Sequence, residues 1–469
     1  MDTLQEFFTQ EMPRMSTLAD RIWSLAELRY AETESAQLHI DGLASLGFRI
    51  TRNVAGIPTA FMAEWGDAGP VIAFLGEYDA LSGMSQQSGA LTCMPSFDSR
   101  SPAGHGCGHH LLGTAAHFAA IALQAHLKVT GGQARIRYYG CPAEEGGSGK
   151  TFMARAGVFD DVDTALTWHP GSYTGVIGQS SLANIQAKFI FHGRASHAAH
   201  SPHLGRSALD AVELMNVGVN YLREHMPPDA RVHYAITDSG GLSPNVVQAR
   251  AEVLYLIRAA RNPDAADLYA RVQNVARGAA LMTDCQVEVV FDKACSNLVP
   301  NTTLCRVLHE KLLAEGPLSV DAGTQAAAAG FQATLRSDEI DAVSRPLAAV
   351  LRGRLPQVFD GVLPYNPEAN EVLYGSTDVG DVSWITPTVQ AWVACFAFGT
   401  PLHSWQMVSQ GQSSLAHAGM LRAARALTAT AIELVERPDL IAQAKAELLE
   451  RRQGQPYQCP IPAEAPLPF

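Results

Sequence analysis

A thiol and an imidazole stand two positions apart in the phrase Gly104-His105-Gly106-Cys107-Gly108-His109. Glycine lets the backbone bend, so Cys107 and His109 can face one point. The alanine-rich apolar stretch that follows, Leu111 to Leu127, predicts a buried helix. At a helix N-terminus the helix dipole favours the thiolate, which is the form that binds metal. The phrase therefore predicts part of a metal site. A glycine-rich turn with a buried structural cysteine is the alternative.

Two adjacent carboxylates, Glu144 and Glu145, follow a predicted strand and precede a glycine-rich turn. Like charges raise each other's pKa, and a divalent cation removes that cost. One carboxylate can then bind metal while its neighbour acts as a general base on water. A solvated acidic turn explains the pair equally well when the pair is taken alone.

Two histidines, His169 and His403, also stand at the ends of predicted strands. Each of them alone is more typical of a core imidazole than of a metal ligand. Together with the two phrases above they make five S, N and O donors, which exceeds the four ligands of one structural zinc site. Such a set suits two cations that share a bridging ligand. The predicted ligands are Cys107, His109, Glu145, His169 and His403.

Length and charge narrow the class of protein. A chain of 469 residues is too long for one ordinary core and favours two domains. Its formal net charge of −12 argues against nucleic acid and against an anionic membrane surface as partners. The eight cysteines lack the spacing of a disulfide framework, and the acidic N-terminal segment lacks the basic start of a signal peptide. No apolar run is long enough to span a bilayer, so we expect a cytoplasmic protein.

Alternating strands and helices predict an α/β fold for most of the chain. Strands are expected at 71–75, 134–140 and 164–168, and 389–398 is expected to be a further buried strand of the same sheet. In α/β sheets functional residues collect at the carboxyl ends of strands. Each of the first three strands ends in candidate groups, which are Glu77 and Asp79, Glu144 and Glu145, and His169.

The middle of the chain differs from its flanks. Strands and helices there follow the order β-α-β-β-α-β, which indicates a small α+β domain inserted into the first. The predicted boundaries are 1–182 and 297–469 for the catalytic domain and 183–296 for the insertion. Residues 3–46 have helical spacing that is broken near Tyr30-Ala31-Glu32, and the proline-rich tail after Arg451 is expected to be irregular.

Eight phrases resemble the metal-dependent aminoacylase/carboxypeptidase family, which includes glutamate carboxypeptidases and amidohydrolases acting on auxin conjugates and hippurate. The resemblance spans about Leu25 to Arg425. It implies a catalytic domain with a mixed sheet flanked by helices, and an inserted lid or dimerisation domain of ferredoxin-like type. The phrases are LGEYDAL, GHGCGHHLLGTAA, GCPAEEGGSGKTFM, TWHP, FHGRASHAAHSPHLGRSALDA, SPNVVQARAEVLYLIR, GSTDVGDVSW and GTPLHSW.

The resemblance also implies roles for the site residues. Cys107 stands where relatives hold a bridging Asp, Glu144 matches the general base, and Asp79 matches a carboxylate that orients a ligand histidine. The remaining ligand positions are matched by His109, Glu145, His169 and His403. Where some relatives have a ligand His this chain has Glu77, so no ligand role is carried over to it, and His105 and His110 receive no role.

In the inserted domain the resemblance implies three further roles. His197 is expected to stabilise the oxyanion across a dimer interface, Asn245 to add a second donor, and Arg258 to hold the substrate carboxylate. His197 read as an ordinary loop histidine is the alternative. Arg206 and Lys150 are further candidates for binding an acidic substrate, although surface charge is the more typical interpretation of both.

The activity implied by the resemblance is amide hydrolysis of an N-acyl amino acid with a free carboxylate, with p-aminobenzoyl-glutamate as the expected substrate. We expect two divalent cations in each protomer, with manganese favoured and zinc as the alternative. A homodimer formed through the inserted domain is expected, or a hetero-oligomer with a related chain. A hydrolase of indole-3-acetyl amino acids, a dipeptidase of the same family, and a regulatory component of a hetero-oligomer remain as alternatives.

Overall fold

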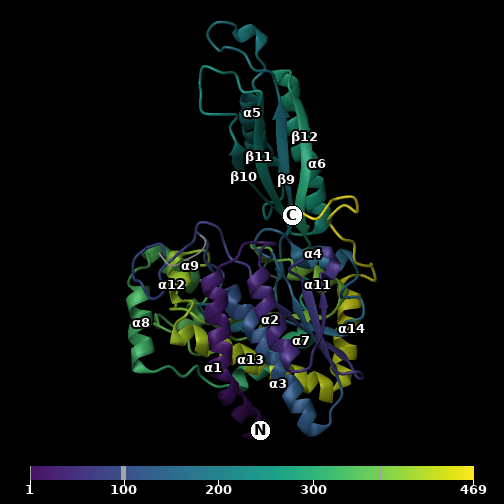
Figure 1. Cartoon of the computed structure of the whole chain (residues 1–469), viewed down its shortest axis with the longest axis vertical. Coiled ribbons are helices and arrows are strands. Elements are labelled where there is room, and N and C mark those ends of the chain that lie inside the picture. The colour runs from purple at the N-terminus through teal and green to yellow at the C-terminus, as the bar shows by residue number, and fades with distance from the viewer. Residues whose placement is uncertain (1, 97–101, 369–371) are drawn as a thin grey trace. The chain divides into compact units, whose positions relative to one another are not determined.

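The structure is a computed structural model that describes residues 2–96, 102–368 and 372–469. The chain forms two compact units (Figure 1). The first unit contains Met1–Gly178, Val299–Asn370 and Val382–Tyr457, and the second contains Gln179–Leu298, Glu371–Asp381 and Gln458–Phe469. Each unit is therefore assembled from segments that are far apart in the sequence.

A six-stranded mixed sheet forms the framework of the first unit. Its strand order is β1-β2-β4-β3-β5-β14, with the last four strands parallel and the first two antiparallel. All six residues of β3 are buried, so this strand is a continuous apolar run without alternation. The predicted mixed sheet is confirmed. The strands are β1 (Arg49–Arg52), β2 (Phe61–Trp65), β3 (Val71–Gly76), β4 (Arg135–Gly140), β5 (Thr164–Leu166) and β14 (Thr388–Val389).

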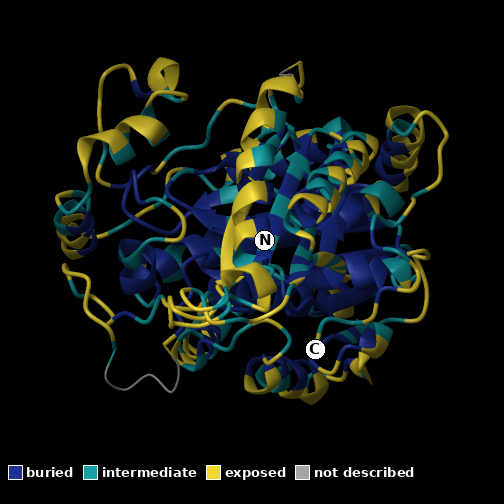
Figure 2. Cartoon of the chain, turned by 90° about the horizontal axis from the view of Figure 1, so that it is seen from above, coloured by how far each residue is buried: buried dark blue, intermediate teal, exposed yellow. Residues whose placement is uncertain are grey.

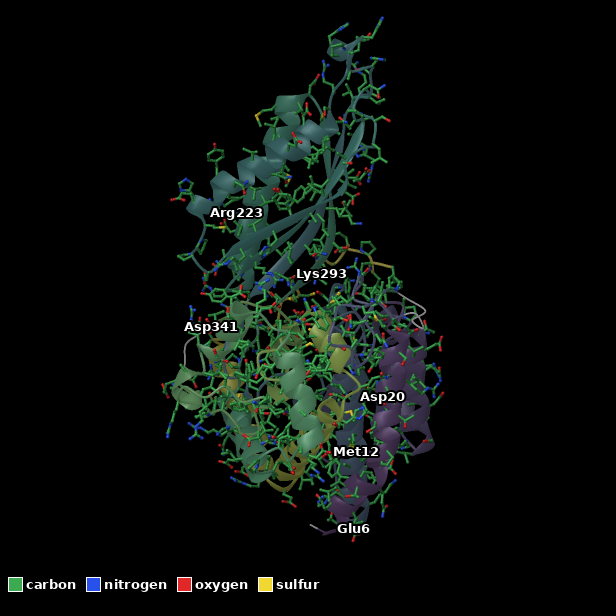
Figure 3. All side chains as sticks on the ribbon, turned by 90° about the vertical axis from the view of Figure 1, so that its left-hand side faces the viewer. Glu6, Met12, Asp20, Arg223, Lys293 and Asp341 are labelled. Carbon is green, nitrogen blue, oxygen red and sulfur yellow. The ribbon has the colours of Figure 1, made fainter. Side chains whose placement is uncertain are left out.

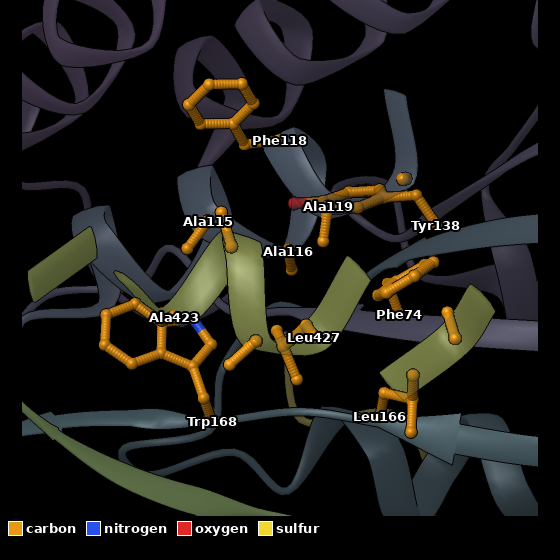
Figure 4. Close-up of a cluster of buried hydrophobic side chains, with 14 of the residues drawn as sticks. Phe74, Ala115, Ala116, Phe118, Ala119, Tyr138, Leu166, Trp168, Ala423 and Leu427 are labelled. Carbon is orange, nitrogen blue, oxygen red and sulfur yellow. The ribbon is translucent and has the colours of Figure 1, made fainter. Parts of the chain in front are cut away.

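Helix α3 (His109–Thr130) lies in the core of the first unit, as the alanine-rich stretch predicted. It packs against β3 and β4 and against helices α1 (Asp2–Leu25) and α13 (Ser414–Glu436). Its small side chains let these neighbours approach closely. Figure 4 shows Ala115, Ala116 and Ala119 of α3 among Phe74 and Leu166 of the sheet and Leu427 of α13.

Further helices cover the buried interior, which is dark blue in Figure 2. On α1 the carboxylate of Asp20 (labelled in Figure 3) accepts a hydrogen bond from His417 Nε2 at 2.9 Å, which ties α1 to α13. The predicted break near residues 30–32 lies between α1 and α2. The further helices are α2 (Thr33–Ser45), α4 (Gly149–Arg155), α7 (Thr302–Ala314), α8 (Ala322–Gln332), α9 (Ser337–Ser344), α10 (Ala348–Leu351), α11 (Val379–Ile385), α12 (Trp405–Gln410), α14 (Pro438–Arg451) and the 3-10 turn η1 (Val54–Gly56).

The expectation of one strand over 389–398 is wrong. β14 ends at Val389 and belongs to the six-stranded sheet, whereas β15 (Ala391–Ala394) joins a separate three-stranded sheet with β6 (His169–Gly171) and β7 (Gly175–Val176). Nearly all residues of this run are buried, so the apolar pattern has no period that could mark the change of sheet.

The second unit contains a four-stranded antiparallel sheet with the order β10-β11-β9-β12. Its elements follow the predicted β-α-β-β-α-β order, and this confirms the α+β class. They are β9 (Ala183–His192), α5 (Ala208–Leu222), β10 (Arg231–Asp238), β11 (Arg250–Ala259), α6 (Asn262–Thr283) and β12 (Gln286–Cys295), with short β8 (Ser180–Ser181), β13 (Val372–Leu373), η2 (Pro202–Leu204) and η3 (Arg223–His225).

Two further observations concern the cysteines and the search for membrane-spanning helices. All eight cysteines are free thiols. A search of the described residues finds no helix with the length and apolar character needed to cross a membrane.

A pair of histidines is buried where α2 contacts α3 in the first unit. His39 on α2 and His117 on α3 are fully buried, and their Nδ1 atoms lie 3.1 Å apart. Burial lowers the pKa of His39 to about 3 and lowers that of His117 well below its ordinary value, with the charge of His39 adding to the effect on His117. Both imidazoles are therefore neutral at pH 7, so the N–H of one ring can donate a hydrogen bond to the unprotonated nitrogen of the other.

This pair predicts a pH dependence of stability. Below pH 6.5 the unfolded chain binds a proton at His39, while the folded chain does not do so until about pH 3, so the stability contributed by the neutral imidazole is present above pH 6.5 and is lost as the pH falls. Between pH 7.5 and 5.5 the free energy of unfolding should fall by about 1.4 kcal/mol more in the wild type than in His39→Gln. Urea unfolding at the two pH values measures this difference, and an equal fall in both proteins would contradict the assignment.

Candidate metal centre

The candidate site lies in the first unit, where β3, β4 and β5 end. The parallel register pairs Gly76 with Gly140, so the residues after β3 and β4 leave the sheet at the same level. The segment after β3 carries Glu77 and Asp79, and the segment after β4 carries the paired glutamates. These are the strand ends at which the sequence placed the candidate groups.

His109, the first residue of helix α3, and Cys107, in the loop before it, face these strand ends. Gly108, the residue before the helix, has a left-handed φ of 75°. A Cβ at this position would lie 2.8 Å from Cγ of Pro170, the residue that follows His169. Glycine is therefore needed at position 108 for its backbone conformation and for its close packing. This packing brings the start of α3 against the strand that carries His169.

The five predicted ligands come together in two groups that share one thiol. Donor atoms of Cys107, His109 and His169 lie within 4.8 Å of one another, and so do donor atoms of Cys107, Glu145 and His403. The distance from Cys107 Sγ to His403 Nε2 is 3.3 Å, and from His403 Nε2 to Glu145 Oε2 it is 3.4 Å. A thiol common to both groups is the arrangement that a bridging ligand requires.

The imidazoles are oriented by their second nitrogen atoms. His109 Nδ1 donates to Asp79 Oδ1 at 2.9 Å, and His169 Nδ1 donates to the carbonyl of Pro170 at 2.8 Å. The Nε2 of His169 is thereby left to face the site in the form that binds a cation. Although burial opposes it, the neighbouring Asp79, Cys107 and Glu77 raise the pKa of His109 well above its ordinary value, so a cation must displace a proton from its Nε2. Burial lowers the pKa of His169 to about 3, so this ring is neutral and able to bind metal.

His403 reaches the site from the loop before α12. Its φ of 56° is left-handed, and its backbone N–H donates to the carbonyl of Gly106 at 2.8 Å. This bond holds the His403 loop against the loop that carries Cys107. The His403 side chain is 54% exposed, whereas that of His109 is fully buried, so the two ligand groups differ in their access to water.

Asp79 contacts both the helix and the loop that carries the glutamates. Its Oδ2 accepts a hydrogen bond from the backbone N–H of Glu145 at 2.8 Å, while Oδ1 binds His109. Ala143, two residues before Glu145, has a left-handed φ of 62°, which costs an alanine roughly 1–2 kcal/mol. The loop therefore has a strained backbone that other groups must hold in place.

The site fits divalent cations, as its donors and buried groups indicate. Oε1 of Glu145 is buried and has no hydrogen-bond partner among the described residues, which is costly unless a cation binds there. Burial raises the pKa of the Cys107 thiol well above its ordinary value, and the charge of Glu145 adds to this. Burial thus outweighs the helix dipole invoked from the sequence, and a bound cation supplies the charge that holds a thiolate.

Glu144 is half-buried beside the ligands, with a carboxylate oxygen within 4.8 Å of donor atoms of Glu77 and His109. It is thus close enough to exchange a proton with a water molecule at the site, which is the requirement for a general base. Its role as the base remains a prediction.

Lys150 differs from its sequence interpretation. It is fully buried on α4, and its Nζ lies 2.6 Å from Oε1 of Glu77, so surface charge does not describe it. Oε2 of Glu77 lies 3.2 Å from His109 Nε2. Sequence reasoning missed this ion pair. The signal in the sequence was a single lysine in a run, 149–154, that is otherwise uncharged, and every residue of this run is buried.

His105 and His110 have structural contacts. His105 Nε2 lies 3.1 Å from the carbonyl of Ile22, and His110 Nε2 lies 2.9 Å from the carbonyl of Gly411. Burial lowers the pKa of His105 to about 4 and that of His110 well below its ordinary value, so both rings are neutral donors. They fasten the start of α3 to α1 and to the end of α12.

The remaining predicted residues belong to the second unit. His197 and Asn245 are exposed and lie on neighbouring loops, since His197 forms a β-bridge with Val246. His197 Nδ1 accepts from the N–H of His200 at 3.1 Å, which leaves Nε2 exposed as a donor. Arg258 lies at the opposite end of β11 and donates to Ser376 Oγ at 2.7 Å. The structure places Arg258 apart from the other two within this unit.

Arg206 also belongs to the second unit. Its Nε lies 2.7 Å from the carboxylate of Asp284, which is 80% exposed. This partial pairing at the surface agrees with the surface-charge interpretation.

Comparisons with known proteins give consistent results. The peptidase dimerisation domain of the M20 type matches residues 179–282. The chain is 51% identical to one of the subunits of p-aminobenzoyl-glutamate hydrolase of Escherichia coli K12 over 458 residues, which cover 96% of this chain and 95% of that protein. It is 30% identical to the Xaa-Arg dipeptidase of Mus musculus over 456 residues, which cover 92% and 88% of the two chains.

A solved structure shares the fold. The dinuclear metal-binding peptidase of the M20 family from Bacillus subtilis matches with a TM-score of 0.57 and 16% sequence identity, over 91% of this chain and 99% of that chain. This likeness carries the fold alone, because the identity is low.

Removal of the shared thiol tests the two-group arrangement. We expect Cys107→Ala to reduce the bound divalent metal measured by elemental analysis, because both groups lose a donor. Cys305→Ala removes a buried free thiol from α7 and serves as the matched control, with unchanged metal content. Equal metal content in Cys107→Ala and wild type would exclude Cys107 as a ligand.

Proposed function

Because the chain belongs to the M20 family of metal-dependent hydrolases, together with the Escherichia coli p-aminobenzoyl-glutamate hydrolase, we propose that it hydrolyses the amide bond of N-acyl amino acids, with p-aminobenzoyl-glutamate as its main substrate. The observation that carries the proposal is the set of five donors in two groups sharing Cys107, beside Glu144, in a chain that matches this relative almost from end to end.

The ligands proposed for the two cations follow the two groups. Cys107, which belongs to both groups, would bind both cations, with His109 and His169 completing one group and Glu145 and His403 the other. When bound, the cations lower the pKa of a water molecule and polarise the substrate carbonyl. Thiolate and imidazole also suit zinc, but carboxylate-containing two-metal sites take manganese, and the family resemblance leads us to propose manganese.

Glu144 performs the proton transfers in this proposal. Its carboxylate accepts a proton from the attacking water, whose oxygen forms a bond to the acyl carbon. The carbon–nitrogen bond then breaks, and Glu144 donates the proton to the departing amine. Asp79 supports these steps indirectly, since it orients His109 and holds the backbone of Glu145.

His197, Asn245 and Arg258 are proposed to bind the substrate. The exposed Nε2 of His197 and the amide of Asn245 are suited to donate to the developing oxyanion, and the guanidinium of Arg258 to bind the free carboxylate. We propose that His197 acts across a dimer interface, which the peptidase dimerisation domain supports. A related chain is an alternative partner, because the Escherichia coli relative is named as a subunit.

A second candidate function is that of a dipeptidase. The mouse Xaa-Arg dipeptidase matches 92% of this chain at 30% identity, and its substrate also has an amide bond next to a free carboxylate.

We further propose that the protein acts in a reducing compartment such as the cytoplasm, which its eight free thiols support.

The general base is tested by Glu144→Gln. We expect kcat to fall by about 10²–10⁴-fold, because the amide cannot accept the proton. Metal content should stay at the wild-type level, since Glu144 lies outside the two groups that share Cys107, whereas loss of metal would point to the third donor group of Glu77, His109 and Glu144. Glu6→Gln changes an exposed glutamate of α1 and is the control. Full activity of the metal-loaded Glu144→Gln protein would refute the role.

The substrate and metal are tested on the purified chain. The apoprotein prepared with a chelator should be inactive, and Mn²⁺ should restore more activity than Zn²⁺ does. The kcat/KM for p-aminobenzoyl-glutamate should exceed that for Xaa-Arg dipeptides and indole-3-acetyl-aspartate. A preference for the dipeptides would support the second candidate. Activity that requires a related chain would instead support a regulatory role in a hetero-oligomer.

A further inference from the structure

Residues 29–32, which directly precede α2, contact the loop that carries the paired glutamates. We call residues 29–32 the α1–α2 turn and residues 143–147 the glutamate loop. Tyr30 Oη donates to the carbonyl of Gly147 at 2.6 Å, and Nη1 of Arg29 donates to the carbonyl of Gly146. These bonds hold the end of the glutamate loop.

The beginning of the glutamate loop is held by Glu32. Its Oε1 accepts a hydrogen bond from the backbone N–H of Ala143 at 2.8 Å, and Thr59 Oγ1 donates to its Oε2 at 2.9 Å. Glu32 is fully buried. The α1–α2 turn therefore binds the loop on both sides of Glu144 and Glu145.

The backbone of both segments is fitted to this contact. Tyr30 and Ala143 each have a left-handed φ of 62°. A Cβ at Gly147 would lie 2.5 Å from the ring of Tyr30, so only glycine allows the ring to approach so closely. A left-handed alanine persists only where its surroundings hold it, and Glu32 is bound to the N–H of Ala143 itself.

The same part of the chain also contacts the segment after β3. The N–H of Ala80 donates to the carbonyl of Glu27 at 2.8 Å, and Leu28 forms a β-bridge with Ala80. Ala80 follows Asp79, which binds the N–H of Glu145. The loops after β3 and β4 are thus fastened to each other and to the chain beside the α1–α2 turn.

We propose that Arg29, Tyr30 and Glu32 are positioning residues that set the geometry of the general base and of the Glu145 ligand through the backbone of the glutamate loop. This inference rests on the proposed function for the role of Glu144. It assigns to the end of the N-terminal helical region a part in metal binding and turnover, although none of the three side chains is itself among the proposed ligands.

The conservative and disruptive variants of Glu32 separate positioning from packing. Burial, followed by the charge of Asp79, raises the pKa of Glu32 to about 8, so glutamine is a close neutral replacement that keeps an oxygen acceptor for Ala143 N–H. Glu32→Ala removes the acceptor. Tyr30→Phe removes only the hydroxyl that binds Gly147. Tyr139→Phe is the matched control, because its hydroxyl also donates to a backbone carbonyl, that of Val158.

Metal affinity by chelator competition, kcat, KM and thermal stability are measured for each variant. We expect Tyr30→Phe and Glu32→Ala to weaken metal binding and lower kcat by about 10–100-fold, with KM changed by less than about threefold. Glu32→Gln should stay within about threefold of the wild type in both. Tyr139→Phe should change only thermal stability. Ala143→Gly should restore part of the activity of Glu32→Ala, because glycine adopts a left-handed φ without strain.

Several results would overturn the proposal. Wild-type metal affinity and kcat in both Tyr30→Phe and Glu32→Ala would do so, and so would equal losses in Glu32→Gln and Glu32→Ala. Losses of activity in proportion to the loss of folded protein, with normal activity in the folded fraction, would also overturn it. An inactive Glu144→Gln together with unaffected turn variants would refute the positioning role alone, whereas an active Glu144→Gln would refute the proposed base.

Discussion

Both oxygens of the buried Asp79 carboxylate accept hydrogen bonds, and the candidate site depends on these two bonds. One comes from His109 at the start of α3, and the other from the backbone of Glu145 after β4. A single side chain after β3 thus fixes the helix, the sheet and the glutamate loop relative to one another. Because the carboxylate is fully buried, water cannot replace either partner, and the arrangement is rigid.

The electrostatics of the site follow from this dense packing. Cys107, Glu77, Glu144 and Glu145 supply acidic groups in a small volume, and Lys150 is bound to Glu77. Removal of charges from water costs several kcal/mol per ion unless opposite charges compensate. The protein thus supplies the negatively charged groups of the site, and bound cations would supply the positive charge that compensates them.

The sequence predicted the parts of this site that depend on local pattern. Cys107, His109, Glu145 and His169 could be placed because each follows a strand or opens a helix, and parallel strands bring such positions to one edge. The fold class, the inserted α+β unit and α3 were predicted for the same reason. The prediction of one strand over 389–398 was wrong because a run that is almost entirely buried has no alternation of polar and apolar residues to mark where one strand ends and the next begins.

The spacing of residues in the sequence could not predict contacts between distant segments. The ion pair of Lys150 and Glu77 joins residues 73 positions apart in number, and the bond of Tyr30 to Gly147 joins residues 117 apart, so neither has a characteristic spacing. The only sign of the α1–α2 turn was an interruption of helical spacing. Only the folded backbone reveals that this interruption faces the glutamate loop.

The order in which the chain supplies its donors has a consequence for biosynthesis. Four of the five proposed ligands lie within residues 107–169, whereas His403 comes 296 positions after Cys107, beyond the segment Gln179–Leu298 of the second unit. A ribosome-bound chain therefore completes one ligand group early and leaves the other open until nearly the whole polypeptide has emerged. Loading of the site with its full metal content becomes a late event, and a fragment that ends before His403 would lack one donor of the second ligand group.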